Sequence, residues 1–181
     1  MNNDYSWLKS IPSNIGNYFS GFVDGEGSFN VSLRKRDDHS LGWQVILTLN
    51  VAQRDNTVLA LMKRHLGCGR LQERADGVWY YVVQNPTAIE ERIIPFFEKY
   101  PFFSSIKKKN FSIFSQIAKI VCKKDHLSNE GILKVIELRE KLNEGKGRKR
   151  KYSLNDYKNS LSENPQRLHA RPKARNHFGK I

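Results

Sequence analysis

The residues best suited to chemistry lie in a short acidic stretch, Asp24-Gly25-Glu26-Gly27, which follows a run of apolar residues. A carboxylate between glycines can reach a hard cation, and Mg²⁺ prefers oxygen ligands while it keeps several of its waters. The further acids at alternating positions that a calcium loop needs are absent from the sequence. Such a stretch can place one carboxylate per chain as a ligand of Mg²⁺, with phosphate oxygens as other ligands, although an ordinary glycine-rich acidic turn has the same residues.

Histidine and cysteine offer no competing site. The five histidines show neither an HExxH motif nor a Cys/His spacing, and Cys68 and Cys122 are far apart. We therefore expect no zinc site and two free thiols in a reducing compartment.

The composition indicates which partners the chain binds. Its 181 residues carry a formal net charge of +13, and 39% of them are hydrophobic, which is enough for a packed core. Such an excess of Lys and Arg favours a polyanion, because neutralised phosphates release counterions. No apolar run is long enough for a bilayer span, and the first residues, MNNDYSW, lack signal-peptide character. We expect a nucleic-acid partner and no membrane.

The acidic stretch ends a predicted helix that begins near Pro12 and Ser13 and finishes at Gly25 and Gly27. Its apolar residues recur at helical spacing: Ile15, Tyr18, Phe19, Phe22 and Val23. Gly21 and Gly25 lie four residues apart on the other face, where they would let a second backbone approach closely.

The remaining patterns predict an α+β fold. Strands are expected over 28–36, 43–51, 69–74 and 78–84, and helices over 56–66, 87–100 with an interruption at Pro95, 107–123 and 128–143. The order is αββαββα, with helices on one face of a four-stranded antiparallel sheet. We place this domain at residues 1–144.

Residues 145–181 form a basic C-terminal extension in this prediction. They hold 11 Lys and Arg against 2 Asp and Glu, so +9 of the net charge lies there. We expect them to be partly helical around 153–161 and otherwise flexible. Sequence-independent phosphate contacts and a plain extension both fit this composition.

Alternation along the strands places polar and basic side chains on the face of the sheet that the helices leave open. Arg, Gln and Asn can bond guanine or adenine edges in the major groove, and apolar side chains can touch thymine methyls. The candidate DNA-binding residues are Asn30, Ser32, Arg34, Arg36, Gln44, Ile46, Thr48, Asn50, Arg70, Gln72, Arg74, Tyr80 and Val82.

The nine residues Phe19 to Gly27, FSGFVDGEG, resemble the LAGLIDADG motif of homing endonucleases. The order of elements over about residues 13–143 is similar to the core of that family. One copy of the motif is present, so the chain resembles the single-motif members, which work as homodimers. The resemblance implies that two motif helices meet at Gly21, Asp24 and Gly25.

The resemblance also implies roles for individual residues. Glu26 matches the metal-binding acid, where many members have Asp, and Gly25 matches the residue whose carbonyl helps to coordinate the metal. Asp24 belongs to the structural part of the helix end. Gln53 matches a residue that orders solvent near the scissile phosphate, and Lys107 one that steadies the nucleophile or phosphate.

Two positions remain open at this stage. Aligning residues 106–109 requires a gap, so Lys108 is nearly as good a match as Lys107. Thr57 stands where the family often has an arginine, and nearby Arg54 is a possible substitute.

The function implied by the resemblance is that of a site-specific endonuclease. A homodimer would bind a long pseudo-palindromic duplex and hydrolyse both strands with Mg²⁺, for which Mn²⁺ or Ca²⁺ are possible substitutes. The cut would leave 3′ overhangs and promote intron homing. The alternative is an RNA maturase that binds and helps to splice its host intron. A DNA-binding regulator would lose the acid and add a helix-turn-helix domain, and the sequence has neither change. The compartment stays open between a prokaryotic cytoplasm, a chloroplast and a mitochondrion.

Overall fold

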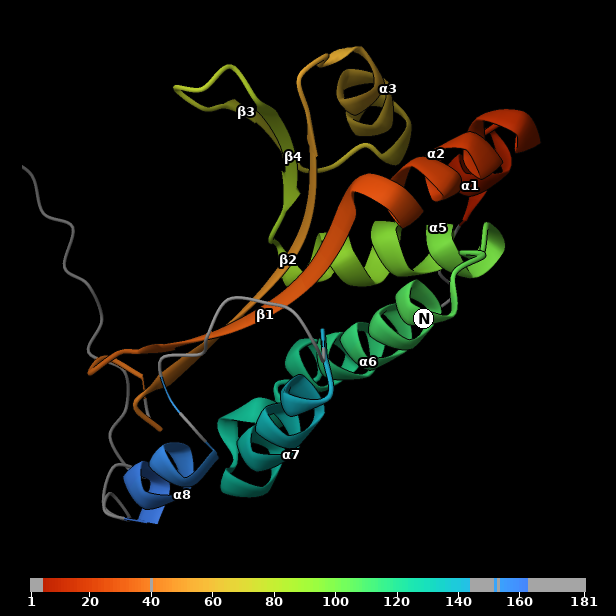
Figure 1. Ribbon diagram of the computed structural model, residues 1–181. Helices are drawn as coiled ribbons and strands as arrows, with labels where there is room; N and C mark the ends of the chain where they lie inside the picture. The colour runs from red at the N-terminus through yellow and green to blue at the C-terminus, as the bar shows by residue number, and fades with distance from the viewer. Residues whose placement is uncertain (1–4, 40, 144–151, 153, 163–181) are drawn as a thin grey trace, which may run out of the picture.

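The computed structural model describes residues 5–39, 41–143, 152 and 154–162, which build one antiparallel sheet with helices against one side of it (Figure 1). The strands are β1 (Gly27–Lys35), β2 (Trp43–Gln53), β3 (Arg70–Glu73) and β4 (Trp79–Val83), in the spatial order β1-β2-β4-β3. The helices are α1 (Ser6–Lys9), α2 (Ser13–Glu26), α3 (Thr57–Leu66), α4 (Pro86–Ala88), α5 (Ile94–Lys99), α6 (Ser105–Cys122), α7 (Asn129–Glu140) and α8 (Leu154–Ser162), with a π-helical turn η1 (Ile89–Ile93) and a 3-10 turn η2 (Asp125–Leu127). The predicted α+β class and order of elements are confirmed.

Side chains of the strands alternate between the two faces of the sheet. In β1, Phe29, Val31 and Leu33 are buried, whereas Ser32 and Arg34 are exposed. The antiparallel register places residues of one face opposite one another on neighbouring strands. The pairs on that face are Asn30 and Thr48, Ser32 and Ile46, Arg34 and Gln44, Asn50 and Val82, Arg70 and Val82, and Gln72 and Tyr80. One face of the sheet is therefore apolar and covered, and the concave face is polar and open (Figure 1).

Aromatic packing fixes α6 against β1. The ring of Phe29 lies 5.0–5.9 Å, between ring centroids, from four other rings: Phe97, Phe102, Phe111 and Phe114. Phe29 and Phe114 are 1% and 0% exposed, and fully burying such a side chain contributes about 1.5–3 kcal/mol. This packing determines where the N-terminus of α6 lies relative to the start of β1.

Two glycines set the position of α2. A Cβ at Gly16 would lie 2.3 Å from Cζ of Tyr100, whose hydroxyl donates to the carbonyl of Ile11 at 3.0 Å. A Cβ at Gly27 would lie 2.4 Å from Cγ1 of Val23. Because Gly27 has no side chain, α2 passes directly into β1 without a connecting loop. The helix ends one residue later than Gly25, which lies within it.

The segment after β4 differs from its prediction. The interruption in helix 87–100 was expected at Pro95, but Pro95 lies in the first turn of α5 and is buried. The irregular turn is η1, which precedes it. Proline has no N–H to donate to the carbonyl four residues earlier, and the wider π turn accommodates this loss.

Helix α8 packs on the domain through a second apolar cluster. Tyr157 is 1% exposed, and its ring centroid lies 4.7 Å from that of Trp43 at the start of β2. Ile132 and Ile136 of α7 complete the contact. Helix was predicted around 153–161; the domain boundary at 144 stays a prediction, and residues 144–151, 153 and 163–181 lie outside the described residues.

The end of α7 contacts the outer edge of β1. Nε of Arg139 donates to the carbonyl of Val31 at 2.9 Å, and Nδ2 of Asn143 donates to the carbonyl of Phe29 at 2.8 Å. Arg139 also donates to the Tyr157 hydroxyl at 3.2 Å, which joins α7 to α8. Among the helices that the structure describes, none has the length and hydropathy of a bilayer span.

Candidate nucleic-acid interface and metal site

The C-terminal end of α2 meets the N-terminal end of α6, and Asp24 joins the two. Its Oδ2 accepts from the main-chain N–H groups of Phe103 and Ser104 at 3.0 and 2.9 Å, and its Oδ1 accepts from the Ser104 hydroxyl at 2.5 Å. Desolvation raises the pKa of Asp24, but the bonds from Ser104 and Phe103 and the charge of Lys107 outweigh it and lower the pKa below 3.8. Asp24 therefore joins the end of α2 to the residues just before α6, and its place in a dimer interface stays a prediction.

Lys107 lies half-buried at the same place. Its Nζ donates to the carbonyl of Gly27, the first residue of β1. Desolvation lowers the pKa of this amine, and the carboxylates of Asp24 and Glu26 oppose that shift. Lys108 is exposed, so the structure brings Lys107 to the acids, in agreement with the match that the sequence preferred.

The helix-end site consists of Asp24, Glu26, Gly27 and Lys107. The Glu26 side chain is exposed at the last position of α2, and the last turn of a helix leaves carbonyls such as that of Gly25 without a helical N–H donor. Both offer the oxygen ligands that hard cations prefer. Within the described residues, His, Cys, Asp and Glu form no group of three that could enclose a metal.

Gln53 ends β2, two residues after Val51, which pairs with Gly27. Its Oε1 accepts from the main-chain N–H of Arg54 at 2.9 Å. The hydroxyl and main-chain N–H of Thr57 both bond Oδ1 of Asp55, at 2.7 and 2.9 Å. The Asp55 carboxylate therefore accepts both bonds from Thr57, the first residue of α3, and Arg54 is exposed beside it.

The open face gathers the predicted DNA-binding residues on one side of the sheet. At its β4 end the side chains form a hollow of about 340 Å³. The hollow is lined by Thr48, Asn50, Arg70, Gln72, Arg74, Tyr80, Val82 and Gln84. Val82 is 8% exposed and forms the floor, so the longer side chains around it are the ones that reach outward.

Two arginines of the open face pair with acids in the hairpin turns. Arg36 makes two bonds to Asp38, at 2.8 and 2.6 Å, and holds the pKa of that carboxyl well below its usual range. Arg74 lies 3.3 Å from Asp76 and donates to the Tyr80 hydroxyl at 2.9 Å. Asp38 and Asp76 belong to the turns that connect the strands, so they lie at the rim of the open face.

Sequence reasoning missed Gln84. It follows Tyr80 and Val82 at the same strand parity, and that parity was the signal that could have identified it. Its amide contacts Arg70 and Thr48 across three strands.

The family model described as LAGLIDADG endonuclease matches residues 19–118, more than half of the chain. The chain belongs to this family.

Individual relatives agree with the assignment to the LAGLIDADG endonucleases. Probable intron-encoded endonuclease 3 of Neurospora crassa is 31% identical over 134 residues, which are 70% of this chain and 24% of the relative. The chain thus spans about a quarter of the length of that relative.

Two solved structures show how much of the length of a family member this chain matches. The archaeal intron-encoded homing endonuclease I-Vdi141I, complexed with DNA, has a TM-score of 0.76 and 32% identity, over 82% of this chain and 94% of that one. Meganuclease I-SmaMI, bound to DNA, has a TM-score of 0.69 and 33% identity, over 76% of this chain and 47% of that one. The chain matches nearly all of the first and half of the second, which fits the single-motif type.

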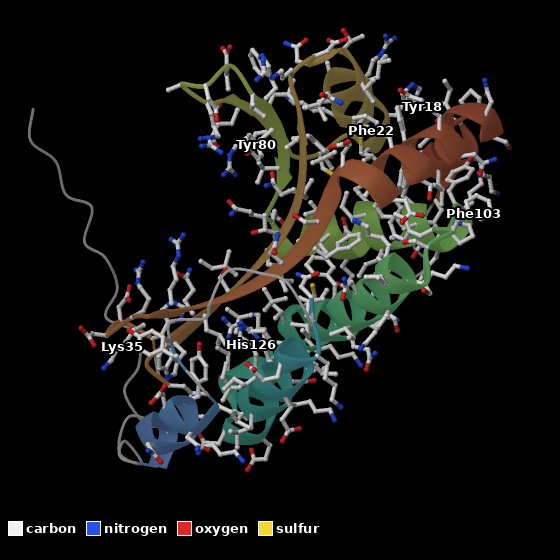
Figure 2. All side chains as sticks on the ribbon, in the orientation of Figure 1. Tyr18, Phe22, Lys35, Tyr80, Phe103 and His126 are labelled. Carbon is white, nitrogen blue, oxygen red and sulfur yellow. The ribbon has the colours of Figure 1, made fainter. Side chains whose placement is uncertain are left out.

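The LAGLIDADG helix α2 presents a bare stripe on its outer side. Gly21 and Gly25 are exposed, and a Cβ at either would meet no atom of this chain within 4 Å. Tyr18, 52% exposed, stacks with Phe22 along one flank of the stripe, and Phe103, 91% exposed, lies on the other flank (Figure 2). The stripe is thus open to contact from outside the chain.

Proposed function

We propose that this chain is a site-specific, metal-dependent homing endonuclease that acts on double-stranded DNA as a homodimer. The observation that carries the proposal is the helix-end site, where exposed Glu26 lies at the end of α2 and the half-buried amine of Lys107 bonds the next residue, Gly27. This site adjoins the open face, whose Arg, Gln and Asn side chains suit base edges in the major groove.

The stripe on α2 supports the homodimer. Glycines four residues apart let two helices approach closely, and the flanking aromatic side chains of Tyr18 and Phe103 can be buried by a second copy. A two-fold pairing through α2 would bring both copies of Glu26 near the symmetry axis. The two open faces would then extend in opposite directions along a pseudo-palindromic duplex.

The donor set fits Mg²⁺, with Mn²⁺ or Ca²⁺ as possible substitutes. Glu26 and the Gly25 carbonyl are hard oxygen donors, a second copy would contribute the same pair, and phosphate oxygens would fill the remaining positions. When bound there, such a cation supplies the charge that polarises a scissile phosphate.

The chain's own groups have separate roles in this proposal. The ammonium of Lys107 stabilises negative charge that develops on the phosphate, and the Gly27 carbonyl holds it in place. Gln53 orients a water molecule from the end of β2. Because each copy carries one such site, the dimer cuts both strands near the centre of the duplex. The two cuts leave 3′ overhangs, and cleavage of the site promotes intron homing.

A cleavage assay tests the proposal. The substrate is a duplex made by joining the two exon segments that flank the host intron, incubated with the pure chain and Mg²⁺. We expect two cuts, which EDTA prevents. Glu26→Gln should lower the rate by roughly 10²–10³-fold while binding is retained.

The matched control is Glu73→Gln, which changes an exposed acid of β3 and should leave the rate unchanged. An intact duplex after incubation with the wild-type dimer would refute the proposal. Binding of the host intron RNA without any DNA cleavage would favour the maturase instead.

A further inference from the structure

The open face contains a bonded triad of side chains from three strands. Gln84, just after β4, accepts at Oε1 from Nη2 of Arg70 at 3.0 Å. Its Nε2 donates to Oγ1 of Thr48 at 3.2 Å. Arg70 belongs to β3 and Thr48 to β2, and all three side chains line the hollow.

The two bonds fix the orientation of the amide. If the amide of Gln84 turned over, its NH₂ group would face the guanidinium of Arg70, where two donors would meet. Held as it is, Gln84 uses its acceptor within the protein. The Thr48 oxygen accepts from Gln84, so its hydroxyl hydrogen points elsewhere.

The groups that the triad can offer to a ligand are therefore mainly donors. They are the remaining N–H groups of exposed Arg70, the second amide hydrogen of Gln84 and the hydroxyl hydrogen of Thr48. In the major groove, guanine presents two acceptors, N7 and O6, and thymine presents one, O4, beside a methyl group, whereas adenine and cytosine each present an amino donor that such a surface repels. The triad is complementary to guanine.

Arg70 also differs from Arg36 and Arg74 in the charge of its partner. Those two arginines pair with the carboxylates of Asp38 and Asp76, which offset their positive charge. The partner of Arg70 is a neutral amide, so its charge remains available to an electronegative base edge.

We propose that Gln84 is a positioning residue that holds Arg70 in place to bond a guanine, so that each half of the DNA site contains a required G·C pair at this position. The inference rests on the proposed function, because it assumes that the open face lies in the major groove of duplex DNA. It names one base of the target site and the residues that select it.

Binding to a pool of duplexes tests the proposal. The pool contains every single-base substitution of the joined flanking segments, and the full chain is mixed with it before the bound fraction is sequenced. We expect the wild type to prefer guanine over the other bases by roughly tenfold or more at one symmetric pair of positions. Arg70→Ala should abolish that preference.

Gln84→Met is the decisive variant, because it fills similar space without either hydrogen bond. It should reduce the guanine preference to about threefold or less at that pair of positions, with Tm and affinity for unrelated DNA unchanged. Gln84→Glu places a carboxylate against Arg70 and should reduce the preference as well. The matched control is Gln44→Met, on the same face but four residues before Thr48, about 13 Å along β2. It should leave this pair of positions unaffected.

The outcomes separate the two proposals. If the wild type binds all duplexes of the pool equally, the proposed function itself fails. If the wild type selects its site but Gln84→Met keeps the full guanine preference, or if the position that depends on Arg70 is not guanine, the inference about Gln84 is wrong while the proposed function stands.

Discussion

The helix-end site and the open face are held together by different kinds of partner. At the helix-end site, most bonds run from a side chain to the main chain: Asp24 accepts from two backbone N–H groups, with the Ser104 hydroxyl as a side-chain donor beside them, and Lys107 donates to the Gly27 carbonyl. On the open face, side chains bond other side chains, as Gln84 does with Arg70 and Thr48.

This difference separates what evolution can change easily from what it cannot. A main-chain partner remains in place whatever its side chain, so the position of the helix-end site depends mainly on the fold. A side-chain partner changes with one substitution, and the exposed residues of the open face can be replaced with little effect on stability. We therefore expect variants of the helix-end site to alter rate or stability, and variants of the open face to alter sequence preference.

After Glu26→Gln, the largest expected effect comes from Lys107→Ala, which removes the ammonium beside Glu26 and should slow cleavage by about 10²-fold while binding is retained. Its pH dependence sharpens the comparison. The ammonium is present at low pH and is lost as the pH rises through a pKa that desolvation lowers below 10.5. Wild-type cleavage should therefore decline at alkaline pH, whereas Lys107→Arg should stay active to higher pH. Identical pH–rate profiles for the two proteins would contradict this role.

Gly16→Ala tests whether the position of α2 depends on its close packing against Tyr100. The added methyl meets the Tyr100 ring, whose hydroxyl bonds Ile11, and overpacking outweighs the gain in helix propensity. We expect the free energy of unfolding to fall by about 2 kcal/mol, measured by urea denaturation.

Gly21→Ala is the matched control for Gly16→Ala. Its methyl meets no atom of this chain within 4 Å, so the monomer should lose no stability, while the dimer dissociates more readily in sedimentation measurements. Equal losses of stability in the two variants would show that contact with Tyr100 is not the cause.

Asp24→Asn should cost about 1 kcal/mol at neutral pH, because the bonds from Phe103 and Ser104 lose a charged acceptor. The folded-state pKa of Asp24 lies below 3.8, so the contribution of its charge is present above that pH and is lost as the pH falls through the folded pKa. The difference between variant and wild type should therefore shrink in acid. A difference that stays constant down to pH 2 would rule out an ionised Asp24 as its source.

The smallest effect on stability is expected from Gln72→Ala on the open face. This side chain is exposed on β3, so the free energy of unfolding should change by less than about 0.5 kcal/mol. Its base preference, measured on the same pool of duplexes, should shift at a position other than the one assigned to Arg70. A loss of stability as large as that of Asp24→Asn would remove the contrast between the two regions.

The sequence was sufficient to predict the order of helices and strands, because period-two alternation and helical spacing are strong along residues 13–143. It also identified which strand residues share the open face, since register follows from alternation once one face is buried. The π turn before Pro95 was not predictable, because the proline signals a break without saying how the neighbouring turns adapt.

Contacts between distant residues were the part that sequence could not supply. The bonds of Asp24 to Phe103 and Ser104 span about 80 positions, and the packing of Tyr157 on Trp43 joins the C-terminal region to β2. Gln84 was overlooked although the predicted strand 78–84 included it and its parity matches that of Val82. Only the packing of α6 on Phe29 shows that Lys107, and not Lys108, lies beside the acids of the helix-end site.

The contacts of Arg139 and Asn143 with β1 have a consequence for self-association. An uncovered outer strand invites pairing with a strand of another molecule, which leads to aggregation. Here the carbonyls of Val31 and Phe29 already accept hydrogen bonds from Arg139 of α7 and from Asn143, three residues beyond the end of that helix. Crowded copies of the chain are therefore hindered from joining β1 to β1 in a continuous sheet, which protects this basic protein from fibre-like growth along that strand.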